Sequence, residues 1–136
     1  ITFFAKIDSD NALIPEDLFD NVVENLLQNA LAKRRREPDL HIEVTLSITK
    51  SILQLLVCDD GSAIPPEIAE NLLREPVQQS RDGLGIGLYH VAKQLMHTDY
   101  KLLINKNEVG LVCFELVSRE ALKSTDTLNT VTHNKL

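Results

Sequence analysis

The sequence lacks several features that would place it in a special class of protein. Its apolar runs are short: the run around Ile52 to Cys58 has the length of a strand, far below the roughly 18 residues of a membrane-spanning helix. It has no excess of basic residues, since its net charge is -6, which argues against a nucleic-acid-binding surface as its main role. With 136 residues, 43% hydrophobic and 25% charged, the composition is that of one ordinary globular domain.

Motifs for metal binding by histidine or cysteine, and for nucleophilic catalysis, are also absent. The only cysteines, Cys58 and Cys113, each lie inside an apolar run, so we expect two separate buried thiols rather than a disulfide, as suits a reducing, cytoplasmic compartment. The four histidines have no second ligand at zinc spacing, and no Ser/His/Asp or Cys/His pairing can be argued. The chain begins with Ile1 and shows no basic segment before an apolar stretch, so we expect a fragment of a longer protein rather than a signal peptide.

The hydrophobic pattern predicts an α/β two-layer sandwich, with a mixed sheet and helices on one face. Pro15 opens a helix that runs to about residue 35, in which apolar doublets recur every four residues. Alternation over 41–49 and the more uniform apolar run over 51–58 predict two paired strands joined by a turn at 50–51, the second strand being central.

Shorter patterns complete the predicted domain. They predict a first strand over 1–7, helices over 65–74 and 88–97, and a closing hairpin of strands 101–105 and 111–118 that turns at 106–108. We expect residues 1–118 to form the folded domain and residues 119–136 to form a polar tail.

Asparagines recur along the first predicted helix at positions 21, 25 and 29. At about 100° per residue, Asn25 and Asn29 lie roughly 40° apart at the edge of the apolar arc, where an amphipathic helix usually has charged residues. Amide oxygens are neutral hard ligands that suit Mg²⁺ beside an anionic phosphate chain. The alternative, two boundary amides that bond to neighbouring groups, stays open at this point.

The central strand ends at Asp59 and leads into the turn Asp60-Gly61-Ser62-Ala63-Ile64-Pro65. The carboxylate of Asp59 could simply cap that turn. It is also a fixed acceptor at the lip of the core, suited to an exocyclic amine on a flat heterocycle. A charge-assisted hydrogen bond of this kind contributes about 1.5–3 kcal/mol.

A glycine-rich turn, Gly83-Leu84-Gly85-Ile86-Gly87-Leu88, leads into the predicted helix over 88–97. Glycines let backbone N–H groups approach phosphate oxygens, and the helix N-terminus adds a favourable dipole. The turn is not a dinucleotide fingerprint, because Leu88 stands where the third glycine would be. It is not a P-loop either, since no Gly-Lys-Ser/Thr follows.

In this order and spacing, the three motifs make the chain resemble the ATP-binding catalytic domain of sensor histidine kinases. That domain has the Bergerat fold of the GHKL superfamily, which also contains DNA gyrase, MutL and the heat-shock chaperone ATPases. Glu24 to Ala30 resembles the N box, Asp59 to Pro65 the G1 box and Gly83 to Leu88 the G2 box. The stretch from Glu75 to Arg81 is similar to a short ATP lid, and the resemblance covers about residues 1–118.

The resemblance implies a role for each matching residue. Asn29 is similar to the Mg²⁺-coordinating asparagine and Asn25 to the partner amide near the phosphates, so these are the expected catalytic residues. Asp59 matches the aspartate that reads the adenine amine, and Gly61 the glycine against the adenine ring. The remaining expected nucleotide-binding residues come from the G1 turn, the lid and the G2 box: Ile64, Arg81, Gly83, Leu84, Gly85, Ile86, Gly87 and Leu88.

The sequence also departs from the family pattern. Ala63 replaces the second G1 glycine, and Ala32 and Lys33 stand where the family has a lysine followed by an aromatic residue. Arg74 and Val77 replace the lid-region phenylalanines, and the Gly-Gly after the G2 helix is missing. The resemblance therefore supports nucleotide binding more strongly than it supports efficient catalysis.

A cation for the phosphates has to come from elsewhere in the chain. Lys33, Arg34 and Arg81 are the expected candidates. For the basic run over 33–36, the alternative is a favourable interaction with the C-terminal end of the helix dipole.

Hydrolytic members of the superfamily position water with a glutamate four residues before the metal asparagine, and here that place is Asn25. An amide cannot act as a general base, and Glu24 points about 100° away. The resemblance thus implies Mg²⁺-dependent transfer of the ATP γ-phosphate to a histidine on a separate phosphoacceptor and dimerisation domain, in a phosphorelay with a response regulator downstream. The alternatives are a serine kinase of the anti-sigma-factor type and a nucleotide-binding pseudokinase.

Partners and specificity follow from the same resemblance. The parent protein is expected to be a homodimer, which could itself be membrane-anchored, whereas this fragment is expected to contact neither nucleic acid nor membrane. We expect ATP to be preferred over GTP, because guanine offers Asp59 a carbonyl oxygen in place of the adenine amine.

Overall fold

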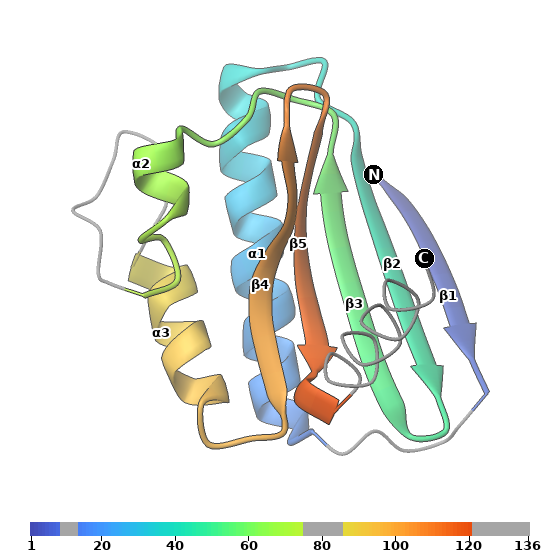
Figure 1. Cartoon of the computed structure of the whole chain (residues 1–136). Helices are drawn as coiled ribbons and strands as arrows, with labels where there is room; N and C mark the ends of the chain where they lie inside the picture. Colours follow the sequence, from blue (N-terminus) through green and yellow to red (C-terminus); the bar gives the residue numbers. More distant parts are fainter. Residues whose placement is uncertain (9–13, 75–85, 121–136) are drawn as a thin grey trace, which may run out of the picture.

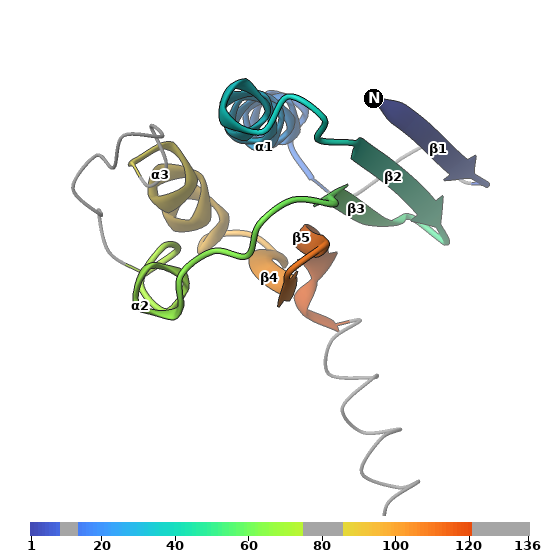
Figure 2. The same cartoon turned by 90° about the horizontal axis from the view of Figure 1, so that it is seen from above.

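The computed structural model describes residues 1–8, 14–74 and 86–120, which form two layers, a five-stranded sheet and helices on one face (Figures 1 and 2). The elements, in chain order, are β1 (Thr2–Ile7), α1 (Glu16–Arg36), β2 (Ile42–Thr49), β3 (Ile52–Asp59), α2 (Pro66–Ala69), α3 (Ile86–Leu95), β4 (Tyr100–Glu108) and β5 (Leu111–Ser118). The predicted α/β two-layer sandwich is confirmed.

The sheet is mixed, with the strand order β1-β2-β3-β5-β4. β1 is parallel to β2, and the other neighbours are antiparallel. β3 is the middle strand, as its uniformly apolar sequence predicts. In Figure 2 β1 lies beyond the helical layer, and accordingly Phe3 and Ile7 on this strand are 65% and 58% exposed.

The core lies between α1, α3 and the sheet. Each element contributes the apolar residues that its periodicity predicts: Val22, Leu26 and Ala30 from α1, Leu88, Val91 and Leu95 from α3, and Leu53, Leu55 and Val57 from β3. Pro15 precedes α1, and the acidic Glu16 and Asp17 occupy its first turn, where they favour the helix dipole. Within the described residues, no helix combines the length and apolar character that crossing a membrane requires.

The turn between β2 and β3 lies where the alternation predicts it. Lys50 and Ser51 have φ values of 52° and 66°, and Thr49 pairs with Ile52 on either side of them. Two central residues with positive φ match the twist of a two-residue hairpin. This turn aligns β3 so that Leu53, Leu55, Val57 and Asp59 all face the helices.

Three predicted boundaries are wrong. The helix predicted over 65–74 ends at Ala69 and continues as turns. The glycine turn was expected to precede the helix over 88–97, but α3 already begins at Ile86. β4 extends to Glu108, so the hairpin turns at Val109 and Gly110 and not at 106–108, because Gly110 supplies the positive φ of 88° that the turn needs.

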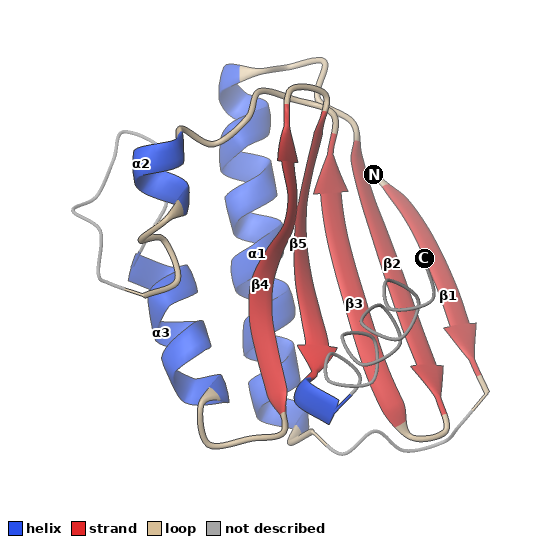
Figure 3. Ribbon diagram, in the orientation of Figure 1, coloured by secondary structure: helices blue, strands red, loops and turns tan. Residues whose placement is uncertain are grey.

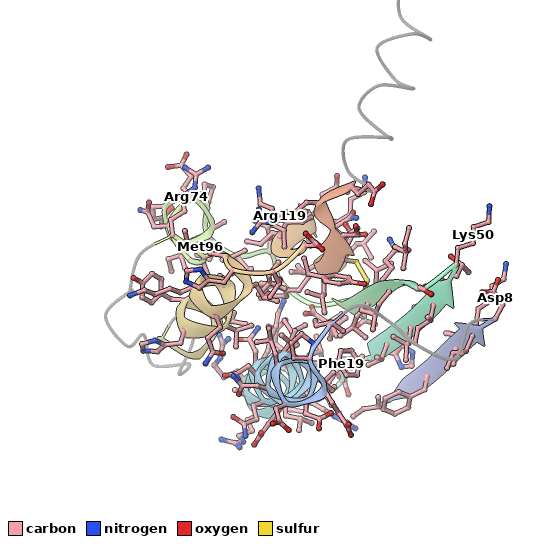
Figure 4. The ribbon with its side chains drawn as sticks, turned by 90° about the horizontal axis from the view of Figure 1, so that it is seen from below. Asp8, Phe19, Lys50, Arg74, Met96 and Arg119 are labelled. Carbon is pink, nitrogen blue, oxygen red and sulfur yellow. A yellow bond between two sulfur atoms is a disulfide. The ribbon has the colours of Figure 1, made fainter. Side chains whose placement is uncertain are left out.

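The expectation of two free thiols is also wrong. Cys58 on β3 pairs directly with Cys113 on β5, and the two form a disulfide, drawn in yellow in Figure 4. The two cysteines are 55 residues apart in sequence, and only the register of β3 against β5 places them opposite each other. Because successive residues of a strand face opposite sides, the disulfide lies on the sheet face opposite to Asp59.

Candidate nucleotide site

A row of polar side chains runs along α1 at every fourth position: Asn21, Asn25, Asn29 and Lys33. At one end the Asn21 amide donates to Gln94 Oε1 of α3 (2.8 Å), and the Asn25 amide donates back to the Asn21 carbonyl oxygen (2.8 Å). At the other end Lys33 Nζ lies 2.8 Å from Asp59 Oδ1. The two ends of the row therefore contact α3 and the end of β3.

Asp59 is a buried carboxylate at the C-terminal end of the central strand. Its Oδ1 accepts a hydrogen bond from the Gly61 N–H (3.0 Å) and one from the Lys33 ammonium (2.8 Å). Lys33 Nζ also donates to the Ser62 carbonyl oxygen. The side chains of Lys33 and Asp59 are only 12% and 9% exposed, so this ion pair is largely shielded from water.

A cavity of about 210 Å³ lies beside this ion pair, between α1, the C-terminal end of β3 and the N-terminal half of β5. It brings together four of the predicted site residues: Asn29, Lys33, Asp59 and Ile64. Ile68, Val112 and Phe114 give it apolar walls. Apolar walls with a few convergent polar groups are typical of small-molecule sites, although this volume is below their usual range of about 300–1,000 Å³ and suits a base rather than a whole nucleotide.

The loop after Asp59 is held by the β4–β5 hairpin, a contact that the sequence did not reveal. The Ile64 N–H donates to Asn107 Oδ1 (2.7 Å), and Asn107 Nδ2 donates to the Ile64 carbonyl oxygen (2.9 Å). The Gly110 N–H donates to the Gly61 carbonyl oxygen (2.9 Å). In Figure 3 the β4–β5 turn lies beside the loop that leads from β3 to α2. The sequence pattern predicts Asn107 in a turn over 106–108, where asparagine is common, so it carries no signal for this contact.

Glu37, directly after α1, holds the same loop from the other side. Its carboxylate accepts from the Ser62 N–H (2.9 Å) and from the Ser62 hydroxyl (2.8 Å), and the backbone hydrogen bond is the main reason that the pKa of Glu37 is lowered. Gly61 has no room for a side chain, since a Cβ there would lie 2.4 Å from Leu40 Cδ1 and 2.8 Å from Glu37 Oε1. Gly61 is thus fixed by the packing of the loop.

Asn25 and Gly87 meet where α1 crosses the start of α3. A Cβ on Gly87 would lie 2.4 Å from Asn25 Oδ1, so the glycine allows the close approach of the two helices. The structure thereby places residues of the predicted N box and G2 box in contact. Leu88 lies 3% exposed in the hydrophobic core and packs rather than facing the 210 Å³ cavity.

Part of the predicted site lies outside the described residues. This holds for the lid residues and for the first glycines of the G2 box, including Arg81, Gly83, Leu84 and Gly85. Ile86 is described as the first residue of α3, but its side chain is not.

The basic run at the end of α1 divides in the structure. Lys33, an expected phosphate cation, instead has its ammonium at Asp59. Arg34 is exposed, whereas Arg36 is among the residues that line the cavity. Glu24 is exposed and accepts a hydrogen bond from Gln28 (3.2 Å), so it points away from the site as predicted.

A second and larger cavity, of about 610 Å³, lies between α2, α3 and β4. Arg74, Met96 and Arg119, labelled in Figure 4, are among its lining residues. Among the described residues, none of those predicted for nucleotide binding lines it. Size alone therefore does not identify the nucleotide site. The buried carboxylate of Asp59 and the amide of Asn29 favour the smaller cavity.

Comparison with known proteins agrees with this arrangement. A family described as "Histidine kinase-, DNA gyrase B-, and HSP90-like ATPase" matches residues 15–120. An NtrY-like sensor histidine kinase of Rickettsia felis is 26% identical over 112 residues, which make up 81% of this chain and 18% of that protein. The chain thus spans about a fifth of the length of such relatives.

Solved structures show the same fold. The catalytic domain of histidine kinase ThkA is similar with a TM-score of 0.64 and 22% identity, covering 86% of this chain and 79% of that one. ThkA in complex with the response regulator protein TrrA is similar with a TM-score of 0.59 and 22% identity, covering 85% of this chain and 34% of that one.

Proposed function

The chain belongs to the histidine kinase-, DNA gyrase B- and HSP90-like ATPase family, and on that premise we propose that it is the ATP-binding catalytic domain of a sensor histidine kinase. It would bind ATP with Mg²⁺ and pass the γ-phosphate to a histidine of a separate domain. The observation that carries the proposal is the shared cavity, to which α1 brings Asn29 and the end of β3 brings Asp59.

The base end of the site is at Asp59. Its carboxylate is buried and is held in place by the Gly61 N–H and by Lys33, so it can accept from an exocyclic amine without reorganising. Ile64, Val112 and Phe114 provide apolar surface for a flat ring. Adenine matches this combination of apolar faces and an edge that carries an amine.

The phosphate end of the site is at the asparagines of α1. Asn29 lines the cavity one helical turn before Lys33, and its amide oxygen fits Mg²⁺, which prefers oxygen ligands and phosphate oxygens together. A bound magnesium ion would neutralise charge on the phosphates. Asn25 contacts Gly87 at the start of α3, so this residue of the G2 box lies on the same side of α1.

The residues near the phosphate end favour transfer of the phosphoryl group to a protein group over hydrolysis. Asn25 is an amide, which cannot act as a general base, and Glu24 is exposed and paired with Gln28. Phosphoryl transfer needs mainly positioning and charge neutralisation, and amides and backbone N–H groups can supply both.

The acceptor would be a histidine outside this chain. His90 is exposed on α3, and its ring contacts Tyr89 with a centroid distance of 5.6 Å, so its surroundings are those of a surface residue. Relatives named sensor histidine kinases are several times longer, and one structurally similar kinase forms a complex with a response regulator. We therefore propose a helical phosphoacceptor and dimerisation domain and a response regulator as partners.

The test is a labelling experiment with γ-labelled ATP. The chain alone should acquire no acid-labile label, and a helical domain carrying the parent protein's histidine should become labelled when it is added. Label on His90 of the isolated chain would contradict this division of roles. ATP binding without label on either component would favour the pseudokinase alternative, and acid-stable phosphoserine on a partner would favour the serine kinase.

A further inference from the structure

The Cys58–Cys113 disulfide lies next to the cavity in the chain, and its redox state bears on the proposed ATP site, on which this inference rests. Asp59 directly follows Cys58 on β3. On β5, Val112 and Phe114 flank Cys113. All three of these neighbours line the 210 Å³ cavity. The disulfide therefore joins the two backbone segments that give the cavity its carboxylate and two of its apolar side chains.

The disulfide is accessible from the side of the sheet that lies away from the cavity. It lies on the sheet face opposite to Asp59, whereas α1 and α3 pack against the face that carries Asp59 (Figures 2 and 4). Cys58 is partly exposed, and Cys113 is only 5% exposed. A thiol can therefore reach the sulfur of Cys58 without entering the core or the cavity.

The two cysteines stay opposite each other when the bond between them is broken. Residues 55–59 of β3 pair with residues 112–116 of β5 in one continuous antiparallel register. The backbone hydrogen bonds of this ladder hold the two strands together independently of the disulfide. The thiols can therefore form the disulfide again without a rearrangement of the chain, which makes the reaction reversible in the folded domain.

Asp59 is the residue whose position depends most on the disulfide. It is the last residue of β3 in both ladders, opposite Val112 of β5 and Ile42 of β2. The ends of strands open more readily than their centres, because they have fewer neighbouring contacts. The covalent bond at the preceding residue, Cys58, limits this opening on the side of β5. Without the bond, the carboxylate has more positions available, and a bound base must restore one of them.

We propose that Cys58 and Cys113 form a thiol–disulfide exchange site that controls the ATP affinity of the cavity. The disulfide state binds ATP, and the dithiol state binds it about 10-fold more weakly, which is the cost of ordering about one residue. In the reaction, a thiolate of a dithiol reductant attacks Cys58 Sγ, the Sγ–Sγ bond breaks, and Cys113 leaves as a thiolate that takes up a proton. The second thiol of the reductant then releases Cys58, so two electrons and two protons pass to the cysteines and the reductant becomes a disulfide.

Calorimetric titration of the unmodified chain with ATP and Mg²⁺, once oxidised and once reduced, tests the proposal. Thiol labelling confirms the state of the cysteines, and ATP should bind about 10-fold more weakly to the reduced chain. Cys113→Ser is the matching variant, because it cannot form the disulfide. Its ATP affinity should equal that of the reduced chain and should not respond to reductant.

Asn105→Ala controls for a general loss of stability. Asn105 donates to Glu115 on the neighbouring strand, so its loss weakens the same sheet without changing the cysteines. In the oxidised state this variant should bind ATP within about 2-fold of the unmodified chain.

The reciprocal effect of ATP on the disulfide is a second, independent measurement. Binding that is 10-fold tighter in the disulfide state stabilises that state by the same factor. Saturating ATP should therefore lower the reduction potential of the cysteine pair by about 30 mV, the equivalent of 10-fold for a two-electron couple. Equilibration of the unmodified chain in mixtures of reduced and oxidised dithiothreitol, with and without ATP and Mg²⁺, gives this shift.

Three results would overturn the inference while leaving the proposed function intact. One is an ATP affinity that agrees within about 2-fold between the oxidised and the reduced unmodified chain, which does not depend on whether any variant folds. Another is a reduction potential that saturating ATP does not change. The third is a pair of cysteines that stays free under oxidising conditions. If ATP binds in neither state, the proposed function itself fails and the inference fails with it.

Discussion

Asn107 is the residue on which the shape of the loop after Asp59 depends most directly. Its side chain makes two hydrogen bonds with the backbone of Ile64, at 2.7 and 2.9 Å, and Ile64 lines the cavity. Each such bond contributes about 0.5–1.5 kcal/mol, so Asn107→Ala should lower the free energy of unfolding by about 1–3 kcal/mol.

The same substitution should weaken ATP binding. Without Asn107, the loop loses its fixed conformation, and binding must order at least one residue at a cost of about 1–2 kcal/mol. That cost corresponds to roughly a 10-fold loss of ATP affinity. Urea unfolding gives the stability change, and calorimetric titration with ATP gives the affinity change.

Asn105→Ala is the matched control on the same strand. Asn105 donates to Glu115 Oε1 (3.1 Å), a side chain on the neighbouring strand β5, and within the described residues it makes no hydrogen bond to the loop after Asp59. Its loss should cost stability but leave ATP affinity within about 2-fold. If Asn107→Ala binds ATP as tightly as Asn105→Ala does, the hairpin does not position the loop, and the reasoning is refuted.

Three further predictions concern other contacts of the site and the sheet. Reducing the Cys58–Cys113 disulfide, which closes a span of 55 residues, should lower the free energy of unfolding by about 4 kcal/mol and the melting temperature by roughly 14 °C. A Cys113→Ser variant is the control and should melt at the same temperature with or without reductant. Identical melting of the unmodified chain in both conditions would contradict the disulfide. Gly87→Ala should destabilise the chain by about 1–3 kcal/mol, because the added Cβ clashes with Asn25. In an Asn25→Ala background the same substitution should stabilise the chain by up to about 1 kcal/mol, because alanine has the higher helix propensity. Equal effects in the two backgrounds would disprove the contact. Asn29→Ala should weaken ATP binding more with Mg²⁺ than without it, as titrations under both conditions would show, and an equal shift in the two titrations would place the metal elsewhere.

The fold could be predicted from the sequence because its elements have strong local patterns. The apolar doublets of α1 and the alternation of β2 each specify one buried face, and both faces are buried in the structure. Features that depend on pairing between distant strands could not be predicted. The disulfide follows from the register of β3 against β5, and no local pattern around Cys58 or Cys113 encodes that register.

The candidate site divides in the same way. Asn29 and Asp59 could be found because each lies at a distinctive local position, and the structure places both at one cavity. The role of Asn107 could not, since it acts on Ile64 from 43 residues away. Lys33 was predicted at the site as a cation for the phosphates, and its spacing of four from Asn29 places it on the same face of α1, but its ammonium contacts Asp59 instead.

The central claim is that Asp59 reads the base of a bound adenine nucleotide, and calorimetric titration of Asp59→Asn with ATP tests it most directly. Asp60→Asn is the control, because Asp60 is exposed and its Oδ1 accepts from the His41 N–H (2.7 Å), a role that an amide oxygen can keep. Asp59→Asn should weaken ATP binding about 10- to 150-fold, and Asp60→Asn should change it by no more than about 2-fold. A folded Asp59→Asn variant that binds ATP as tightly as the unmodified chain would contradict the claim.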